Sequence, residues 1–327
     1  MKIAIIAPNG GKQVISERGM KMFEALGEVV LNPGEASVEN VKATIKDADI
    51  AVTSWGSTTL TKEILDEAPN LKLVVHAAGS VKPIESDELW ARGIRVCAST
   101  KPLGIGVAET SLGFAISASK NFYQHNANIH NGGYGEYKEN IKELYEITVG
   151  VISAGWVGRH FIKLMNNFDV DILLYDPYTT EEQAAAMGCK KAELADLLKA
   201  SDIVSIHAPS IPATRHMFNA DTLKLMKKDA VLINTSRGSL IDEKALYEHM
   251  AAGNLKYACL DVYDPEPILP DNPLRTLDNV ILTPHLAGLA ANGKYRIGKH
   301  AAEQIANFIN GKPMECEVTQ DMLATIA

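Results

Sequence analysis

Three residues able to bind or transfer charge follow three separate stretches of apolar sequence. Arg237 comes after VLINTS, Glu266 lies in LDVYDPEP, and His285 comes after VILTP. Each apolar stretch is predicted to be a strand of a parallel sheet, and ligands of such sheets bind beyond the carboxyl ends of the strands. We therefore expect the three side chains to converge on one crevice.

The three residue types suit the reduction of a 2-oxo acid. A guanidinium presents a planar fork of donors to a carboxylate and polarises the carbonyl beside it, which is the role expected of Arg237. His285 can give a proton to the carbonyl oxygen as a hydride reaches the carbon, and take it back in the reverse reaction. Glu266 can accept a hydrogen bond from the other ring nitrogen and hold the imidazole in place. Each residue alone also fits a plainer role, as a packing histidine, a turn arginine or an exposed loop acid, but the coincidence of all three favours catalysis.

A dinucleotide-binding pattern precedes these residues in the chain. In VGVISAGWVGRHF (residues 149–161), Ser153, Gly155 and Gly158 follow the G-x-G-x-x-G spacing, with serine at the first position. Glycines there let backbone N–H groups and a helix N-terminus approach a pyrophosphate. Asp176 lies about 20 residues further on, where an acid binds the adenosine ribose, and its charge favours NAD over NADP. The glycine pattern alone also fits a simple tight turn, and the serine costs on the order of 1 kcal/mol if its position needs a positive φ.

The elements around these residues predict an α/β fold with two doubly wound parallel-sheet domains. Short apolar runs such as KIAIIAP and LKLVVHAAG alternate with amphipathic helical stretches, which parallel crossovers need. A long apolar helix is predicted over residues 106–125, and further strand candidates follow it. The last long helix, residues 290–309, can fold back on the first domain. We expect a smaller flavodoxin-like substrate domain from residues 1–104 with 293–327, and a Rossmann NAD-binding domain from residues 105–292.

Composition and charge limit the classes of partner. The 327 residues carry a net charge of −8 with no block of Lys and Arg, which argues against binding nucleic acid or an anionic membrane surface. No leader-like N-terminus and no long uncharged apolar run is visible, so we expect a cytoplasmic location. The four cysteines lie too far apart for a disulfide framework or a Cys-based zinc site, and no metal is expected. They are best explained as reduced thiols: Cys97, Cys189, Cys259 and Cys316.

Longer blocks within residues 147–288 resemble the D-isomer-specific 2-hydroxyacid dehydrogenase family, which includes D-3-phosphoglycerate dehydrogenases and glyoxylate/hydroxypyruvate reductases. The most specific blocks are LLYDPY, DIVSIHAPSIPATRHMFN, LINTSRGSLIDEKAL, LDVYDPEP and VILTPHLAG. GVAETSLGFAI, which begins at Gly106, is similar to the family's long interdomain and dimer helix, so the resemblance implies a homodimer. The first part of the chain matches only loosely. The resemblance implies NAD as the cofactor and a small 2-hydroxy or 2-oxo acid as the substrate.

The resemblance also implies roles for individual residues. Arg237, Glu266 and His285 are the expected catalytic set. The expected NAD contacts are Gly155, Trp156, Val157, Gly158, Asp176, Ala208, Thr235, Asp261, His285 and Gly288. Backbone N–H groups of Gly79 and Ser80 are expected to hold the substrate carboxylate. Trp55 is a candidate wall of the substrate pocket, and equally a candidate core aromatic.

The loop around Gly79 departs from the family pattern. Residues 76–84 read HAAGSVKPI, so His76 stands where the family carries arginine, and Lys82 and Pro83 replace an Asp-Asn pair. Lys82 either meets a second anionic group of the substrate or is a solvated surface residue. Two other functions stay open: an NAD(H)-sensing, co-repressor-like protein without turnover, and oxidation of phosphite at the same site. Formate oxidation is disfavoured, because the formate enzymes carry glutamine where Glu266 stands.

Overall fold

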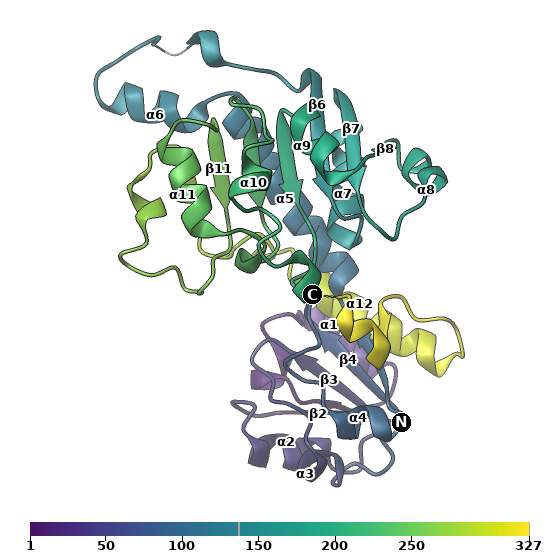
Figure 1. The fold of residues 1–327 in the computed structure, drawn as a ribbon. Coiled ribbons are helices and arrows are strands. Elements are labelled where there is room, and N and C mark those ends of the chain that lie inside the picture. The colour runs from purple at the N-terminus through teal and green to yellow at the C-terminus, as the bar shows by residue number, and fades with distance from the viewer. Residues whose placement is uncertain (137, 327) are drawn as a thin grey trace. The chain divides into compact units, whose positions relative to one another are not determined.

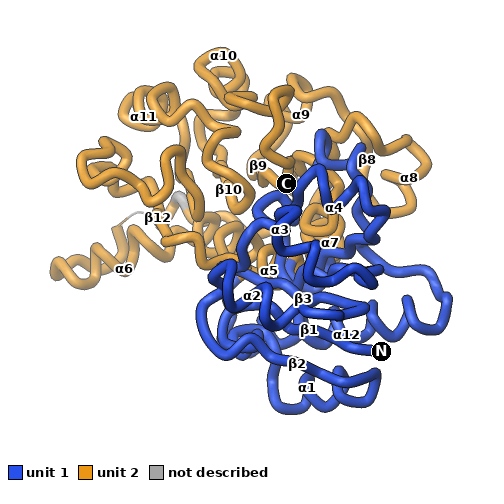
Figure 2. The backbone as a smooth tube through the Cα atoms, turned by 90° about the horizontal axis from the view of Figure 1, so that it is seen from below, with its two compact units in different colours: residues 1–103, 289–327 blue, residues 104–288 orange. Residues whose placement is uncertain are grey.

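The computed structural model describes residues 1–136 and 138–326, which form two compact units (Figure 2). Unit 1 comprises Met1–Leu103 and Leu289–Ala327, and unit 2 comprises Gly104–Gly288. The chain crosses between the units after Leu103 and after Gly288, whereas the sequence placed these crossings after residues 104 and 292. Each unit has its own sheet and its own hydrophobic core, and each is described by itself.

Unit 1 is built on a six-stranded sheet (Figure 1). Its strands are β1 Lys2–Ile5, β2 Glu28–Leu31, β3 Ile50–Ser54, β4 Leu73–Ala77, β5 Arg95–Ala98 and β13 Glu317–Val318. They lie in the order β13-β5-β4-β3-β1-β2, and all neighbours are parallel except β13, which is antiparallel to β5. Every residue of β3 and β4 is buried, which explains why their sequences are continuous apolar runs.

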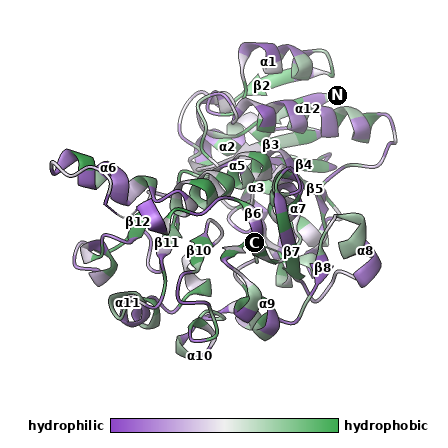
Figure 3. Cartoon of the chain, turned by 90° about the horizontal axis from the view of Figure 1, so that it is seen from above, coloured by the Kyte–Doolittle hydropathy of each residue, from purple (hydrophilic) through white to green (hydrophobic). Residues whose placement is uncertain are grey.

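Five helices cover this sheet. They are α1 Glu17–Glu24, α2 Val38–Ile45, α3 Lys62–Leu65, α4 Asp87–Ala91 and α12 Tyr295–Ile309. The side chains of Ser16, Ser37 and Ser86 each accept a backbone N–H at the start of α1, α2 and α4, which stabilises those helix ends. The C-terminal helix α12 contacts both α1 and β4, so it lies on unit 1. In Figure 3, α12 carries both green and purple residues, as expected for a helix with one buried face.

Unit 2 is built on a seven-stranded sheet. Its strands are β6 Tyr145–Ile152, β7 Asp169–Tyr175, β8 Lys190–Lys191, β9 Ile203–Ile206, β10 Val231–Asn234, β11 Tyr257–Leu260 and β12 Val280–Leu282. They are all parallel, in the order β12-β11-β10-β9-β6-β7-β8. The strand order reverses between β6 and β9, and ligands of open α/β sheets bind at the carboxyl ends of the strands beside such a reversal. The two sheets confirm the predicted fold class of two parallel α/β domains.

The helices of unit 2 differ from the sequence prediction at one place. They are α5 Thr100–Ser119, α6 Phe122–His130, α7 Trp156–Met165, α8 Glu181–Ala186, α9 Leu194–Ala200, α10 Ala220–Leu223 and α11 Glu243–Ala251. The single helix predicted over residues 106–125 is wrong, because α5 starts at Thr100, four residues before unit 2 begins, and a break separates it from α6. Asn121 makes the break by adopting a left-handed φ of 56°. Within the described ranges, no helix combines the length and apolarity needed to span a bilayer.

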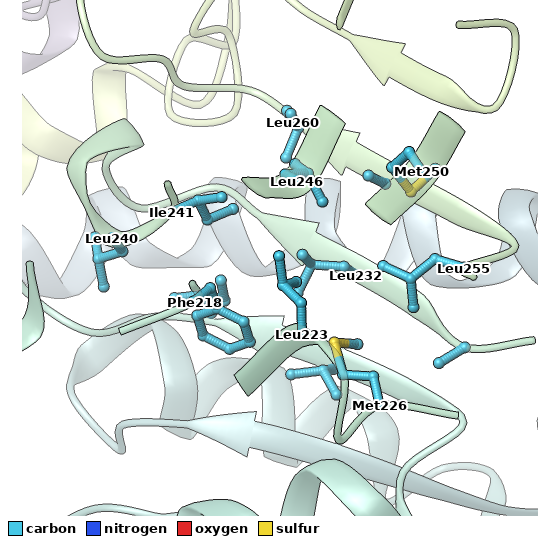
Figure 4. Packing of buried hydrophobic residues seen from close by; sticks show 14 of the residues in the cluster. Phe218, Leu223, Met226, Leu232, Leu240, Ile241, Leu246, Met250, Leu255 and Leu260 are labelled. Atoms are coloured by element: carbon cyan, nitrogen blue, oxygen red, sulfur yellow. The ribbon is translucent and has the colours of Figure 1, made fainter. Parts of the chain in front are cut away.

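A compact apolar core holds the strand ends of unit 2 in place. Phe218, Leu232 on β10 and Leu246 on α11 are all fully buried in one cluster, which Figure 4 shows from close by. Burying such side chains stabilises the unit by roughly 1.5–3 kcal/mol each. The loops that follow β9, β10 and β11 therefore begin at strands that are packed into this core.

Candidate active site

The loop after β6 has the shape of a phosphate-binding turn. Ser153 adopts a φ of 76°, which serine rarely does, and its N–H donates to the carbonyl of Tyr175 over 2.8 Å. Gly158 is required for packing, because a Cβ there would lie 2.0 Å from the carbonyl oxygen of Ser153. A Cβ at Gly155, in contrast, would meet nothing within 4 Å, so the backbone there is open to an approaching group. Ser153, which stands at the first glycine position of the G-x-G-x-x-G pattern, thus adopts the positive φ that a glycine would adopt there.

Asp176, directly after β7, ties this loop to the neighbouring strand. Its buried carboxylate accepts the N–H of Ala154 over 2.7 Å, the hydroxyl of Ser153 over 3.3 Å and the N–H of Tyr178 over 2.8 Å. The bond from the Ser153 hydroxyl offsets part of the strain of its positive φ. Each carboxylate oxygen has two lone pairs, so the group keeps capacity to accept hydroxyls of a ribose.

These residues fit a dinucleotide. Helix α7 begins at Trp156, and Gly155 before it supplies no side-chain cap; the first turn, which the structure describes, has no acid. Uncapped N–H groups and the positive end of the helix dipole favour an anion such as a pyrophosphate. Trp156 and Val157 form that first turn, and Trp156 is 40% exposed.

The predicted catalytic residues come together in unit 2. His285 Nδ1 lies 2.5 Å from Glu266 Oε1, and the two side chains are 46% and 35% exposed. Arg237 is more enclosed, and burial lowers the pKa of its guanidinium below the ordinary value while the charge of Glu266 raises it. Glu266 therefore interacts with both of the other residues. The remaining ring nitrogen of His285, Nε2, is the atom that can exchange a proton with a ligand.

A buried acid fixes the loop that carries His285. Asp261, which is fully buried, accepts the hydroxyl of Thr283 over 2.5 Å and the N–H groups of Leu286 and Ala287 over 2.9 and 2.8 Å. These bonds flank His285, whose φ of 51° is itself unusual for a non-glycine residue. The carboxylate of Asp261, expected from the resemblance to contact NAD, thus also holds the loop of residues 283–288.

Helix α5 hydrogen-bonds residues that follow β10 and β12, and the loops after β10 and β11 make a close backbone contact at Gly238. The hydroxyl of Ser111 lies 2.9 Å from that of Thr235, and the hydroxyl of Thr110 donates to the carbonyl of Ala287 over 3.4 Å. A Cβ at Gly238 would lie 1.9 Å from the backbone of Tyr263, so the loops after β10 and β11 touch at a point that only glycine allows. The sequence did not single out Ser111, Thr110 or Tyr263, because small polar residues and a tyrosine carry no spacing signal.

Ala208 and its neighbour lie directly after β9. Ala208 is buried, and the N–H of His207 donates to the carbonyl of Ile152 over 2.9 Å, beside the phosphate-binding turn. The ring of His207 lies 5.1 Å from that of Phe161 and its Nε2 is 3.0 Å from the hydroxyl of Ser205. Burial lowers the pKa of His207 to about 3, so its ring is neutral at pH 7. The last expected cofactor residue, Gly288, ends unit 2.

The remaining candidate residues belong to unit 1. Gly79 and Ser80 follow β4 and are partly exposed. Trp55 follows β3 and packs, partly buried, against the core of this unit, as the plainer interpretation of this residue expected. The ammonium of Lys82 donates to the carbonyl of Ile326 over 2.8 Å, so this side chain is engaged with the C-terminal segment.

Comparison with known proteins identifies the family. Residues 112–287 match the profile of the D-isomer specific 2-hydroxyacid dehydrogenase NAD binding domain. A D-3-phosphoglycerate dehydrogenase of Methanocaldococcus jannaschii is 36% identical over 302 residues, which cover 92% of this chain and 57% of that protein. A glyoxylate reductase of Thermofilum pendens is 31% identical over 319 residues, covering 95% of this chain and 94% of that protein. The chain belongs to the D-isomer-specific 2-hydroxyacid dehydrogenase family, as its sequence blocks predicted.

A solved structure shows the same fold. The NAD complex of a D-isomer specific 2-hydroxyacid dehydrogenase from Lactobacillus delbrueckii ssp. bulgaricus matches with a TM-score of 0.83 at 20% identity, over 98% of this chain and all of that one. Unit 2 contains the family's NAD-binding domain, and NAD is the cofactor of this chain, as predicted. The chain spans little more than half the length of the two D-3-phosphoglycerate dehydrogenases that it matches at 36% and 32% identity.

Proposed function

We propose that the chain is an NAD-dependent oxidoreductase that interconverts a small D-2-hydroxy acid and its 2-oxo acid. The observation that carries the proposal is the 2.5 Å contact between His285 Nδ1 and Glu266 Oε1, with Arg237 in electrostatic contact with the same carboxylate. Reduction of a 2-oxo acid requires a proton donor beside a group that binds a carboxylate, and these three residues supply both. Membership of the family supports the same activity.

His285 is the proposed general acid and base. In the direction of reduction, the protonated ring donates from Nε2 to the carbonyl oxygen of the substrate, while Nδ1–H stays hydrogen-bonded to Glu266. In the direction of oxidation, neutral Nε2 accepts the proton of the hydroxyl group. NAD, when bound, supplies or accepts the hydride at the substrate carbon. Glu266 stabilises the charged ring and fixes which nitrogen faces the substrate.

Arg237 is the proposed carboxylate-binding residue of unit 2. Its guanidinium is partly buried, which lowers its pKa, so it gains more from pairing with an anion than an exposed arginine does. In the same geometry it polarises the carbonyl next to the carboxylate. Partial negative charge that grows on the carbonyl oxygen during reduction is stabilised by this fixed positive charge.

Cofactor and substrate contacts complete the proposed site. We assign the pyrophosphate to the turn of Gly155, Trp156, Val157 and Gly158, and the adenosine ribose to Asp176. The other proposed NAD contacts are Ala208, Thr235, Asp261, His285 and Gly288. For unit 1 by itself, we propose that the backbone N–H groups of Gly79 and Ser80 bind a substrate carboxylate and that Trp55 is a candidate substrate contact. Lys82 is not assigned to the substrate, because its ammonium is bound to Ile326.

We also propose a homodimer formed through α5. This helix is apolar around much of its circumference, and Ile105, Val107 and Ile116 are only partly buried within the chain. Apolar side chains left at a surface favour association. Light scattering tests this: a mass of two chains supports the proposal, and a monomer at micromolar concentration contradicts it.

The activity is tested by following NADH absorbance with a panel of acids. The panel contains glyoxylate, hydroxypyruvate, pyruvate and longer or branched 2-oxo acids, with phosphite and NAD in the opposite direction. We expect NADH oxidation with at least one 2-oxo acid, and a product of the D configuration where the product is chiral. NADH binding without turnover of any acid would contradict the proposal and favour an NAD(H)-sensing protein, and turnover of phosphite alone would indicate the other chemistry.

A further inference from the structure

We propose that Glu243 is a positioning residue: its carboxylate fixes both ends of the loop that carries Glu266, and so holds the ring of His285 in the orientation needed for proton transfer. The inference rests on the proposed function, in which Glu266 accepts the Nδ1–H of His285. Glu243 is the first residue of α11, and the loop runs from Asp264 to Asn272, between β11 and β12. All of these residues belong to unit 2.

Both oxygens of the Glu243 carboxylate bind this loop. Oε1 accepts the backbone N–H of Asp264 over 2.9 Å, and Oε2 accepts an N–H of the Asn272 side chain over 2.6 Å. The start of α11 is capped by Asp242, whose side chain accepts the N–H of Ala245 over 3.1 Å. An acid in the first turn of a helix is ordinarily explained by the helix dipole. Here the same acid also joins the two ends of a loop.

The amide of Asn272 is held in one orientation. Its Oδ1 accepts the backbone N–H of Leu274 over 3.0 Å, which leaves Nδ2 facing Glu243. The reverse orientation would place an oxygen against the carboxylate and an NH2 group against an N–H donor. Glu243 and Asn272 are both half-buried, so their contact is partly shielded from water. Glu243 therefore needs two acceptor oxygens, which a carboxylate has and an amide lacks.

Hydrogen bonds, rather than packing, have to hold the part of the loop around Glu266. Residues 264–267 lie at the exposed surface, so little apolar area is buried there. Arg275 holds the later part of the loop through the carbonyls of residues 268–269, over 3.1 and 2.9 Å. The bond from the N–H of Asp264 to α11 comes just before Glu266 in the chain, so it limits where that carboxylate can lie.

The placement of Glu266 decides which nitrogen of His285 carries the proton. Glu266 Oε1 lies 2.5 Å from Nδ1, so the neutral ring is held as the Nδ1–H tautomer and Nε2 is the nitrogen that accepts a proton. A displaced Glu266 would release both the tautomer and the orientation of the ring. Loss of the bonds to Glu243 is therefore expected to lower kcat through His285, although Glu243 itself does not touch the ring.

The inference is tested with variants that exchange the two partners. Glu243→Gln places an N–H group against Nδ2 of Asn272, and Asn272→Asp places a second carboxylate against Glu243, so each variant breaks the contact. In Glu243→Gln/Asn272→Asp the new amide can donate to the new carboxylate, and the bond returns with donor and acceptor exchanged. Glu248→Gln is the matched control, because Glu248 is an exposed acid of the same helix.

We measure kcat and KM for the best 2-oxo acid, Kd for NADH, and the tautomer of the neutral His285 ring. NMR of protein with isotope-labelled histidine reports the tautomer, and His285→Ala assigns the signal. We expect each single variant to lower kcat about tenfold and to reduce the share of the Nδ1–H form, with KM and NADH Kd changed less than about twofold. The double variant should return to within about threefold of the wild-type kcat, and Glu248→Gln should match the wild type.

The double variant separates positioning from a general effect on folding. An unchanged kcat and tautomer in Glu243→Gln would overturn the inference, and so would a double variant whose loss equals the product of the two single losses. Loss of NADH binding in step with kcat, or a wild-type ring without the Nδ1–H form, would also overturn it. A wild type that reduces no acid would contradict the proposed function alone, because the tautomer and its return in the double variant still decide the role of Glu243.

Discussion

Arg237 and Glu266 have different electrostatic roles in the candidate site. The guanidinium is partly buried and the carboxylate is partly exposed. The charge of the carboxylate raises the pKa of the guanidinium, and the carboxylate also holds the imidazole of His285. A substrate carboxylate entering this arrangement meets a fixed, poorly solvated cation. The shape of the guanidinium therefore matters as well as its charge.

Replacing Arg237 with lysine tests this claim. Lysine keeps the charge but loses the planar fork, so we expect kcat/KM for the best 2-oxo acid to fall on the order of 10²-fold, through a higher KM and a lower kcat together. The Kd for NADH, measured by fluorescence, should be close to that of the wild type. A value of kcat/KM within about threefold of wild type would show that only the charge is needed.

Asp176 carries the second prediction at this scale. Its buried carboxylate would lie close to the 2′-phosphate of NADPH and repel it, so the wild type should prefer NADH. Asp176→Ser should bind NADH more weakly, because the bonds to Ala154 and Tyr178 are lost, and bind NADPH more tightly. Titration of both cofactors by fluorescence distinguishes the outcomes. Equal weakening for both cofactors would assign Asp176 a structural role only.

The loop of residues 283–288 is the element on which the chemistry depends. It is short, it contains a non-glycine residue at positive φ, and its conformation is maintained from β11 by one carboxylate. Asp261 sits at the end of a strand that is completely buried. Hydrogen bonds to Asp261, rather than apolar packing, therefore fix the loop that carries His285 to the end of β11.

Asp261→Asn should loosen this loop. The amide can accept fewer hydrogen bonds than the carboxylate and places its N–H groups against the N–H donor of either Leu286 or Ala287, so we expect a loss of about 1–3 kcal/mol in the free energy of unfolding. kcat should fall because His285 is no longer fixed. Denaturant unfolding and steady-state kinetics measure the two effects. Asp264→Asn, an exposed acid paired with Arg215, is the control and should unfold within about 0.5 kcal/mol of wild type. Unchanged stability of Asp261→Asn would contradict the role given to this acid.

The elements also show what the sequence could predict. Strands buried on both faces, such as β4, have continuous apolar sequences and are predicted from them. Candidate catalytic residues that directly follow parallel strands are predicted to lie at the same edge of the sheet. The two-residue strands β8 and β13 have no such pattern and were missed. The break at Asn121 was missed because apolar residues continue beyond it.

Contacts between residues that are far apart in the chain could not be predicted from the sequence. Thr53 and His76 meet only because β3 and β4 pair in one particular register. Asp261 meets Leu286 and Ala287 only because the chain after β12 turns back across β11. Spacing along one sequence does not determine either contact. Residue types predicted the candidate site, whereas the groups that position it required the structure.

The whole molecule contains a buried neutral histidine in each unit, His76 in unit 1 and His207 in unit 2. Burial lowers their pKa values from 6.5 to about 4 and about 3. At these two sites the unfolded chain therefore binds more protons than the folded chain below about pH 6.5. The stability associated with these groups is fully present above about pH 6.5 and is lost as the pH falls towards the folded pKa values.

Acid unfolding tests this behaviour. Between pH 7 and about pH 5, His207 alone should account for about 2 kcal/mol of lost stability, because one pKa unit corresponds to about 1.4 kcal/mol. His207→Asn cannot titrate, so its free energy of unfolding should fall less steeply over this range than that of the wild type. His130→Asn, at an exposed site, should keep the wild-type slope. Parallel slopes for the wild type and His207→Asn would contradict the burial argument.

The most direct test of the proposed chemistry is the rate of NADH oxidation by His285→Ala on the best acid of the panel. Loss of the proton donor should lower kcat roughly 10²–10⁴-fold. NADH binding should weaken only slightly, because His285 is one of ten proposed NAD contacts and the phosphate-binding turn between β6 and α7 is left unchanged. A variant that binds NADH and retains the wild-type rate would contradict the assignment of His285 as the group that transfers the proton.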